Sequence, residues 1–197
     1  MASSRSPGPV PSFTGSHILL LFLNISRSAY VGRGALAKQS GLGEGATRTV
    51  LRRLKEKGYV DTIKSGCFLT PAGKLACKSI ASWATDVVTV PRSELTMGEH
   101  QTAVALKGAG GSMRLGIEQR DSAIRVGAAA ATTYIIQSGR FTIPGGSTNC
   151  EKDFPGPSWS YLKTHLAPRN NDVVILCGAQ DEVSARLGAL AAAITLL

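Results

Sequence analysis

The feature that most constrains the fold is a succession of short periodic segments in the first ninety residues. Apolar residues recur at helical spacing over 16–26, and a shorter helix closed by a glycine is predicted over 34–40. A longer segment over 42–58 places its apolar residues on one face and basic residues over the rest, and it too ends at a glycine. Three consecutive helices are therefore expected, the third of them basic.

A hairpin and a fourth helix are predicted directly after this basic helix. Two β-prone runs over 59–70 are separated by residues 64–66, which are typical of a short turn. Thr70 is a suitable N-cap, and Pro71 is favoured at the first position of a helix. Helix, short helix, basic helix, hairpin and helix is the order of a winged helix-turn-helix domain.

Two stretches of this domain carry a family resemblance. Residues 32–60, including the Lys-Gly pair at 57–58 followed by two apolar residues, and the later segment 69–73 closely resemble prokaryotic winged-helix transcription regulators over about 13–85. The whole chain is similar to an archaeal family that couples such a module to an uncharacterised C-terminal α/β domain. The resemblance implies that double-stranded DNA is the partner of the first half, and it implies no established activity for the second.

The distribution of charge agrees with a polyanionic partner. The chain has a formal net charge of +9. Residues 1–90 hold 12 basic and 4 acidic side chains, whereas residues 91–197 hold 10 and 9. A basic first half favours binding to a polyanion such as DNA.

The third helix of a helix-turn-helix lies in the major groove, so its outward residues are the candidates for contact with bases and phosphates. An arginine there can bind guanine in a bidentate manner, whereas a basic hairpin tip contacts the phosphate backbone. There are two alternatives to DNA binding. The charged face of this helix is simply exposed to water, or the domain binds another protein. The predicted DNA-contacting residues are Glu44, Ala46, Arg48, Thr49, Arg52, Arg53 and Lys55 on the helix, and Lys64 and Ser65 on the hairpin.

We expect a disordered arm over 1–12, the winged-helix domain over 13–85, a linker over 86–99 marked by a proline, and a C-terminal domain over 100–197. Patterning in the last part predicts the order β-α-β-β-α-β-α, and the fold class is therefore α+β. A ferredoxin-like (split βαβ) sandwich with an added terminal helix suits this order, and a small three-layer fold is the alternative. The expected elements are strands 101–107, 132–137, 140–143 and 172–177 and helices 115–126, 158–166 and 182–197.

A glycine-rich turn between the first strand and helix of this domain invites an anion-binding interpretation, because glycines let backbone amides approach an anion. Neither a P-loop nor a dinucleotide-binding pattern is present, and a purely structural turn is the alternative. A small anionic metabolite is the expected ligand. The residues that would bind it are Gly108, Gly110, Gly111, Ser112 and Arg114.

The sequence contains only weak candidates for a catalytic site or a metal site. The four cysteines form no C-x-x-C pair, so no zinc ribbon, dense disulfide framework or other metal site is predicted. Cys150 could be a nucleophile with His165 or His100 as its base, and Cys150, His165 and Cys177 could bind a metal. Single cysteine and histidine residues at unrelated positions are, however, more often packing or surface residues. No cofactor and no catalytic residue is predicted.

These observations together predict a cytoplasmic, homodimeric DNA-binding regulator whose C-terminal domain senses a ligand, dimerises or does both. The apolar stretches are too short for a membrane span, so no membrane association is expected. The competing hypothesis is an enzyme that acts on a small phosphorylated or nucleotide-like substrate and carries the winged helix as a regulatory attachment.

Overall fold

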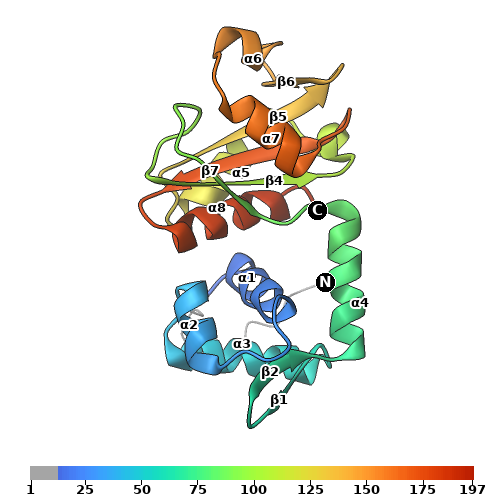
Figure 1. The fold of residues 1–197 in the computed structure, drawn as a ribbon, viewed down its shortest axis with the longest axis vertical. Helices are drawn as coiled ribbons and strands as arrows, with labels where there is room; N and C mark the ends of the chain where they lie inside the picture. The colour runs from blue at the N-terminus through green and yellow to red at the C-terminus, as the bar shows by residue number, and fades with distance from the viewer. Residues whose placement is uncertain (1–12) are drawn as a thin grey trace, which may run out of the picture.

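The computed structural model describes residues 13–197, so the arm expected over 1–12 lies outside the described residues. The N-terminal half contains three helices, a hairpin and a fourth helix, in the order that the winged-helix interpretation requires (Figure 1). Its elements are α1 (Gly15–Ser26), α2 (Arg33–Ser40), α3 (Glu44–Glu56), β1 (Val60–Ile63), β2 (Gly66–Leu69) and α4 (Pro71–Trp83).

Turn chemistry sets the boundaries of these elements. Gly41 ends α2 with a φ of 66°, a left-handed conformation that glycine adopts without steric cost, and the chain turns there into α3. At the start of α4, the Thr70 hydroxyl accepts a hydrogen bond from the Gly73 amide at 3.1 Å, and Pro71 occupies the first turn. Both helix boundaries agree with the sequence prediction.

The C-terminal half is a five-stranded antiparallel sheet in the order β3-β4-β7-β5-β6, with helices on both of its faces (Figure 1). Its elements are β3 (Val88–Val90), β4 (His100–Leu106), the short 3₁₀ helix η1 (Ala109–Ser112), α5 (Ile117–Ile124), β5 (Ala130–Gln137), β6 (Arg140–Thr142), α6 (Cys150–Asp153), α7 (Ser158–Leu166), β7 (Val173–Ala179) and α8 (Glu182–Ile194).

Strand β7 explains why the sheet is covered on both sides. It lies between β4 and β5, and all of its residues are buried. Successive side chains of a strand point to opposite faces, so Ile175 packs in the core beneath α8 whereas Val174 and Leu176 pack in the core beneath α7. An uninterrupted apolar strand needs apolar partners on both faces.

The α+β class predicted from the sequence is confirmed, and so is the split βαβ arrangement. Strands β4 and β5 flank β7, and β6 and β7 flank β5, so each βαβ unit has one antiparallel strand inserted between its two strands. The layering differs from the ferredoxin-like sandwich, because α5 and α8 pack on one face and α7 packs on the other. The three-layer alternative describes this half correctly.

The segment 86–99, expected to be a linker, is part of the C-terminal sheet. It contains β3, which pairs with β4 and forms an edge of the sheet. Further along, the backbone of Met97 lies against Gly178, where a side chain would collide with it. The linker interpretation is therefore wrong, because this segment makes backbone hydrogen bonds that a free linker lacks.

Helix α1 joins the two halves, since it contributes to two hydrophobic cores. Leu21 and Ile25 are buried in the core of the N-terminal half, together with α3 and the hairpin. Leu20 is also fully buried, but in the core formed with α8. At the same contact, the Arg186 guanidinium of α8 donates to the Asn24 side chain at 3.4 Å. The first and the last helix of the described chain thus pack on each other.

Candidate nucleic-acid interface

Helix α3 is strongly amphipathic, and this fixes which of its side chains reach solvent. Val50, Leu51 and Leu54 are buried in the N-terminal core. Arg48 and Arg52 are one helical turn apart on an exposed face, and Lys55 continues the same stripe by a further turn. Packing of the apolar side therefore orients a row of cations away from the core.

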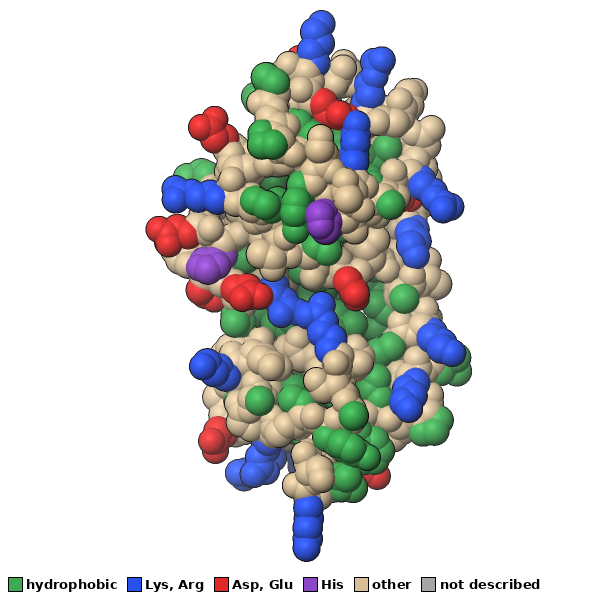
Figure 2. Space-filling model, in the orientation of Figure 1, with side chains coloured by type: hydrophobic (Ala, Val, Ile, Leu, Met, Phe, Trp, Pro, Cys, Tyr) green, Lys and Arg blue, Asp and Glu red, His purple; other side chains and the backbone are tan. Residues whose placement is uncertain are grey.

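A groove of about 500 Å³ lies between this row and the β1–β2 hairpin. Its wall on α3 is formed by Arg48, Arg52 and Lys55, and its wall on the hairpin includes Lys64. A further cation, Arg33, enters from the first turn of α2. None of the residues that line the groove is acidic. Figure 2 shows basic side chains projecting from this end of the molecule.

Two of these cations have carboxylate partners at the margin of the groove. Lys55 Nζ lies 2.6 Å from Asp61 Oδ1, and Arg52 Nε lies 3.9 Å from Glu56 Oε1. The hydrogen bond from Lys55 is the main reason why the pKa of Asp61 lies below its ordinary value. All four side chains are exposed, so water screens both pairs and either can be exchanged for a phosphate at low cost.

The remaining cations of the groove, Arg33, Arg48 and Lys64, form no ion pair within the part of the chain that the structure describes. All three residues are exposed. The positive charge of the groove is therefore incompletely compensated by the protein itself, which favours an anionic partner.

The structure brings together five of the predicted DNA-contacting residues and separates the others. Arg48, Arg52, Lys55, Lys64 and Ser65 all line the groove. Sequence reasoning missed Arg33, because its approach to the groove depends on how α2 packs against α3.

Four predicted residues lie outside the groove lining. The Arg53 guanidinium lies over the Phe13 ring, 5.1 Å from its centroid. Ala46 is half-buried, packs partly against the N-terminal core and does not line the groove. The Thr49 hydroxyl donates to the Gly45 carbonyl at 3.0 Å, and Glu44 is exposed at the first position of α3.

The glycine-rich turn after β4 has a structural role. The Gly108 amide donates to Asp172 Oδ1 at 2.8 Å, and the Gly110 amide donates to the Asn171 carbonyl at 2.8 Å. A side chain at Gly110 would collide with Asn171, whereas Gly111 has open space around it. Two amides on which the predicted anion site depends are thus already bonded inside the protein, and the structural alternative describes the turn better.

The other two residues of that predicted ligand site, Ser112 and Arg114, line a separate hollow of about 670 Å³ beside α5. This hollow is also lined by Arg125, Glu118 and Asp121, so its charged side chains are two arginines and two carboxylates. The two carboxylates offset the positive charge that would attract a small anion. The predicted anion site is therefore not assembled at this turn.

Among the described residues, Cys150 makes no hydrogen bond with His165 or His100, the two bases considered for it. Burial raises the pKa of Cys150 and raises the pKa of Cys177 to about 12, so both thiols stay protonated at neutral pH. The His165 ring stacks on that of Tyr161, and its Nδ1 lies 2.9 Å from the Tyr161 carbonyl oxygen. Within residues 13–197, no group of three His, Cys, Asp or Glu side chains could hold a metal ion. Over the same range, no helix is long and apolar enough to cross a bilayer.

Comparisons with known proteins concern the family and the fold. A family described as "Domain of unknown function (DUF4443)" matches residues 97–196. A solved structure of a hypothetical protein from Pyrococcus horikoshii OT3 is similar, with 22% sequence identity, a TM-score of 0.74, and coverage of 93% of this chain and 92% of that one. At this identity the likeness shows a shared fold. A comparison with curated proteins finds no match. Both positive findings fit an archaeal family, and the chain belongs to the DUF4443 family.

Proposed function

We propose that this protein is a DNA-binding transcription regulator. The N-terminal half is a winged helix-turn-helix, with α2 and α3 as the helix-turn-helix and the β1–β2 hairpin as the wing. The observation that carries the proposal is the groove between α3 and the hairpin, which is lined by five cations and no carboxylate. An open cationic surface on this element order is suited to the backbone of duplex DNA.

The proposed roles of the groove residues follow from their positions. Arg48 lies in the first half of α3, the part of a recognition helix that meets base edges, and it has no ion pair among the described residues to compete with guanine. Arg52 and Lys55 lie further along the helix and contact phosphates. Lys64, at the tip of the hairpin, reaches the neighbouring backbone, and Arg33 extends the phosphate contacts onto α2.

The C-terminal domain is proposed to sense a ligand, to dimerise, or to do both. A homodimer matches the two-fold symmetry of a palindromic operator. The contact between α1 and α8 couples ligand binding in the C-terminal domain to the position of the DNA-binding helices, because α1 packs both on α2 and α3 and on the C-terminal core.

The proposal is tested by removing charge from the groove. The double variant Arg48→Gln/Arg52→Gln should lose at least about tenfold in affinity for duplex DNA, because two charge-assisted contacts are removed. The matched control is Arg125→Gln/Arg140→Gln, which removes the same charge from exposed positions of the C-terminal half and should retain affinity. Binding is measured by fluorescence anisotropy on a random-sequence duplex, with melting temperatures recorded for every variant.

Equal affinity of the groove variant, the control and the wild type would overturn the proposal. The groove would then be better interpreted as a docking surface for an acidic protein.

A further inference from the structure

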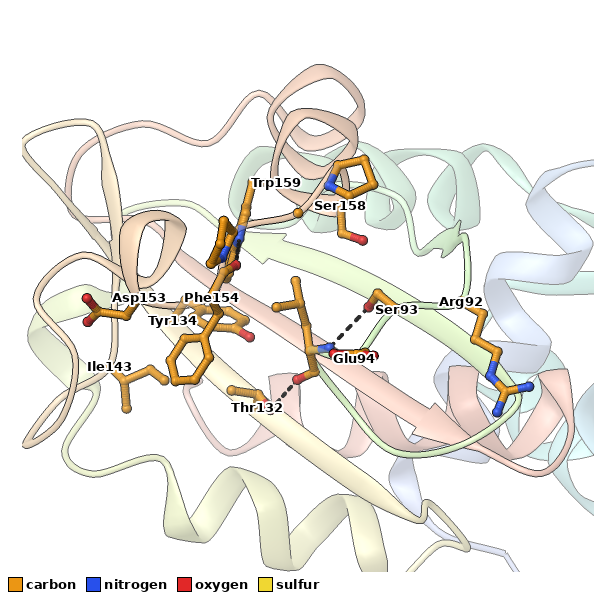
Figure 3. Close-up of a pocket in the computed structure, with 14 residues that line it drawn as sticks. Arg92, Ser93, Glu94, Thr132, Tyr134, Ile143, Asp153, Phe154, Ser158 and Trp159 are labelled. Carbon is orange, nitrogen blue, oxygen red and sulfur yellow. Dashed lines mark hydrogen bonds between the residues drawn. The ribbon is translucent and has the colours of Figure 1, made fainter.

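A cavity of about 730 Å³ in the C-terminal domain lies well away from the basic groove. Four parts of the chain surround it (Figure 3). Strand β5 contributes Thr132 and Tyr134, the loop after β3 contributes residues 92–95, the end of β6 is followed by Ile143, and the segment from α6 into α7 contributes residues 153–159. Its size is typical of pockets that bind small molecules.

One hydroxyl group at the wall of this cavity has no hydrogen-bond partner in the protein. Ser158 is 8% exposed, and its hydroxyl makes no hydrogen bond among the described residues. The Tyr134 hydroxyl, in contrast, has the Thr132 side chain as a hydrogen-bond partner, and the Thr132 hydroxyl donates to the Leu95 carbonyl at 3.3 Å. Buried polar groups in proteins are almost always hydrogen-bonded. The unpaired Ser158 hydroxyl is therefore available to a molecule bound in the cavity.

Aromatic side chains form one side of the cavity. The rings of Tyr134 and Trp159 pack edge to face with centroids 5.3 Å apart, and Trp159 Nε1 donates to the Phe154 carbonyl at 2.8 Å. This bond holds the segment that carries the Phe154 ring, which is 55% exposed. Figure 3 shows the three aromatic side chains on one side of the pocket and Ser93 and Arg92 on the other. The aromatic side suits a flat apolar body.

The charged residues of the cavity have both signs. Arg92 and Glu94 form no ion pair among the described residues, whereas Asp153 already accepts a hydrogen bond from Ser147 at 2.6 Å. Next to them, α7 begins after Pro157 with no side-chain cap, so its first amides add to the Ser158 hydroxyl as donors. A cationic group can be matched by Glu94, and a carboxylate by Arg92, Ser158 and the start of α7.

We propose that this cavity binds a small aromatic zwitterion, of the class of the aromatic α-amino acids. The ring lies against Tyr134, Phe154 and Trp159, the ammonium group faces Glu94, and the carboxylate is held at Ser158. Binding of the amino acid depends on the cavity alone. A regulatory role of this binding rests on the proposed function. The chain connection that would link the two sites is short, since the cavity wall formed by residues 92–95 follows β3, and β3 follows α4 of the DNA-binding half.

The test is titration calorimetry on the full chain, without DNA, using L-tryptophan, L-phenylalanine and L-tyrosine as probes. At least one of them should bind saturably at one site per chain. 3-Phenylpropanoate lacks the ammonium group and 2-phenylethylamine lacks the carboxylate, so each should bind at least about tenfold more weakly, because one charged contact is lost.

Two variants locate the site. Glu94→Gln should weaken binding of the amino acid by about tenfold while leaving 3-phenylpropanoate unaffected, and Ser158→Ala should weaken binding of the amino acid less, because it removes one hydrogen bond from an uncharged donor. Glu99→Gln, an exposed carboxylate outside the cavity lining, is the control and should bind as the wild type does. Melting temperatures of the unliganded variants check that each one folds.

Absence of saturable binding by all three amino acids would overturn the inference. So would binding of either truncated probe as tightly as the amino acids, or a Glu94→Gln variant that binds the amino acids like the wild type. These outcomes are distinct from failure of the DNA proposal, since no DNA is present and the groove residues are unchanged.

Discussion

The basic groove and the aromatic cavity select partners by different physical means. The groove is open, its charged side chains are exposed, and its lining includes cations without carboxylates. The cavity is lined by buried hydroxyls, aromatic rings and charges of both signs. Under the two proposals, affinity for DNA at the groove grows with the number of phosphates in contact, whereas affinity for a small molecule at the cavity depends on the fit of a few groups. The predictions below test how far the two sites, and the two halves that carry them, behave differently.

Salt should separate the two sites most clearly. If all five groove cations contact phosphates, a rise from 50 to 200 mM salt should weaken DNA binding by about 10²–10³-fold, because each contact adds about 0.9 to the salt slope. Binding of an amino acid in the cavity should change by less than about threefold, since a neutral zwitterion releases no counterions. Anisotropy and calorimetry measure the two dependences. A flat salt dependence for DNA would contradict the electrostatic account of the groove.

Removing the α1 side chain that packs on α8 should show that the two halves are not independent in stability. Leu20 is fully buried in the core with α8, so Leu20→Ala should lower the free energy of unfolding by about 2–5 kcal/mol. Denaturant unfolding followed by tryptophan fluorescence reports the loss through Trp83, which packs against the core that contains Leu20, and Trp159, which is buried in the core beneath α7. The exposed Leu75 provides the control, and Leu75→Ala should change stability by less than about 0.5 kcal/mol. Loss confined to one half would show that the halves unfold separately.

Base readout and phosphate contact should be separable within the groove. Arg48→Ala should relax the sequence preference and cost about 1–3 kcal/mol on the preferred site. Lys64→Ala should weaken all sequences alike, because a phosphate contact carries no sequence information. Selection from a random DNA pool measures both effects. An unchanged consensus for the Arg48 variant would remove this residue from base readout.

Loss of the α4 cap should destabilise the protein without changing either site. The Thr70 hydroxyl accepts from the Gly73 amide and donates to the Gly58 carbonyl at 2.5 Å, so Thr70→Ala should cost about 1 kcal/mol. Chemical denaturation measures this cost. DNA affinity per folded molecule and ligand binding in the cavity should equal those of the wild type, and Thr70→Ser should restore most of the stability.

The smallest effect is expected at Asp61, on the margin of the groove. Its pKa is held below the ordinary value by the hydrogen bond from Lys55, so the charged pair persists above the ordinary pKa and is lost only as the pH falls through the lowered value. DNA affinity should therefore not change through this pair between pH 7 and pH 5. Asp61→Asn releases Lys55 and should raise the salt slope by at most about 0.9. A steeper pH dependence in the wild type than in this variant would contradict the assignment.

The order and the boundaries of the elements in the N-terminal half could be predicted from the sequence, because they depend on local interactions. The order of its elements, the turn at Gly41 and the cap at Thr70 depend on residues close together in the chain, and all were predicted. The groove cations on α3 were predicted for the same reason, since helical periodicity alone orients them. Arg33 was missed, because its position depends on how two helices pack.

In the C-terminal half, segment boundaries were predicted better than their arrangement. Helix α7 spans the predicted residues 158–166, yet the sequence could not decide between a two-layer sandwich and three layers, and it did not predict the cavity, because both depend on contacts between distant segments. The turn at Gly110 illustrates this: its conformation is explained by Asn171, about sixty residues further along the chain. A glycine-rich sequence does not reveal whether its amides bond to a ligand or to the protein.

The contact between α1 and α8 also orders events during synthesis. Translation proceeds from the N-terminus, so α1 leaves the ribosome long before α8, and its Leu20 surface stays uncovered until that helix has emerged. The N-terminal half therefore reaches its final packing only after α8 has been made. A product that ends before α8 would expose this apolar surface to the solvent.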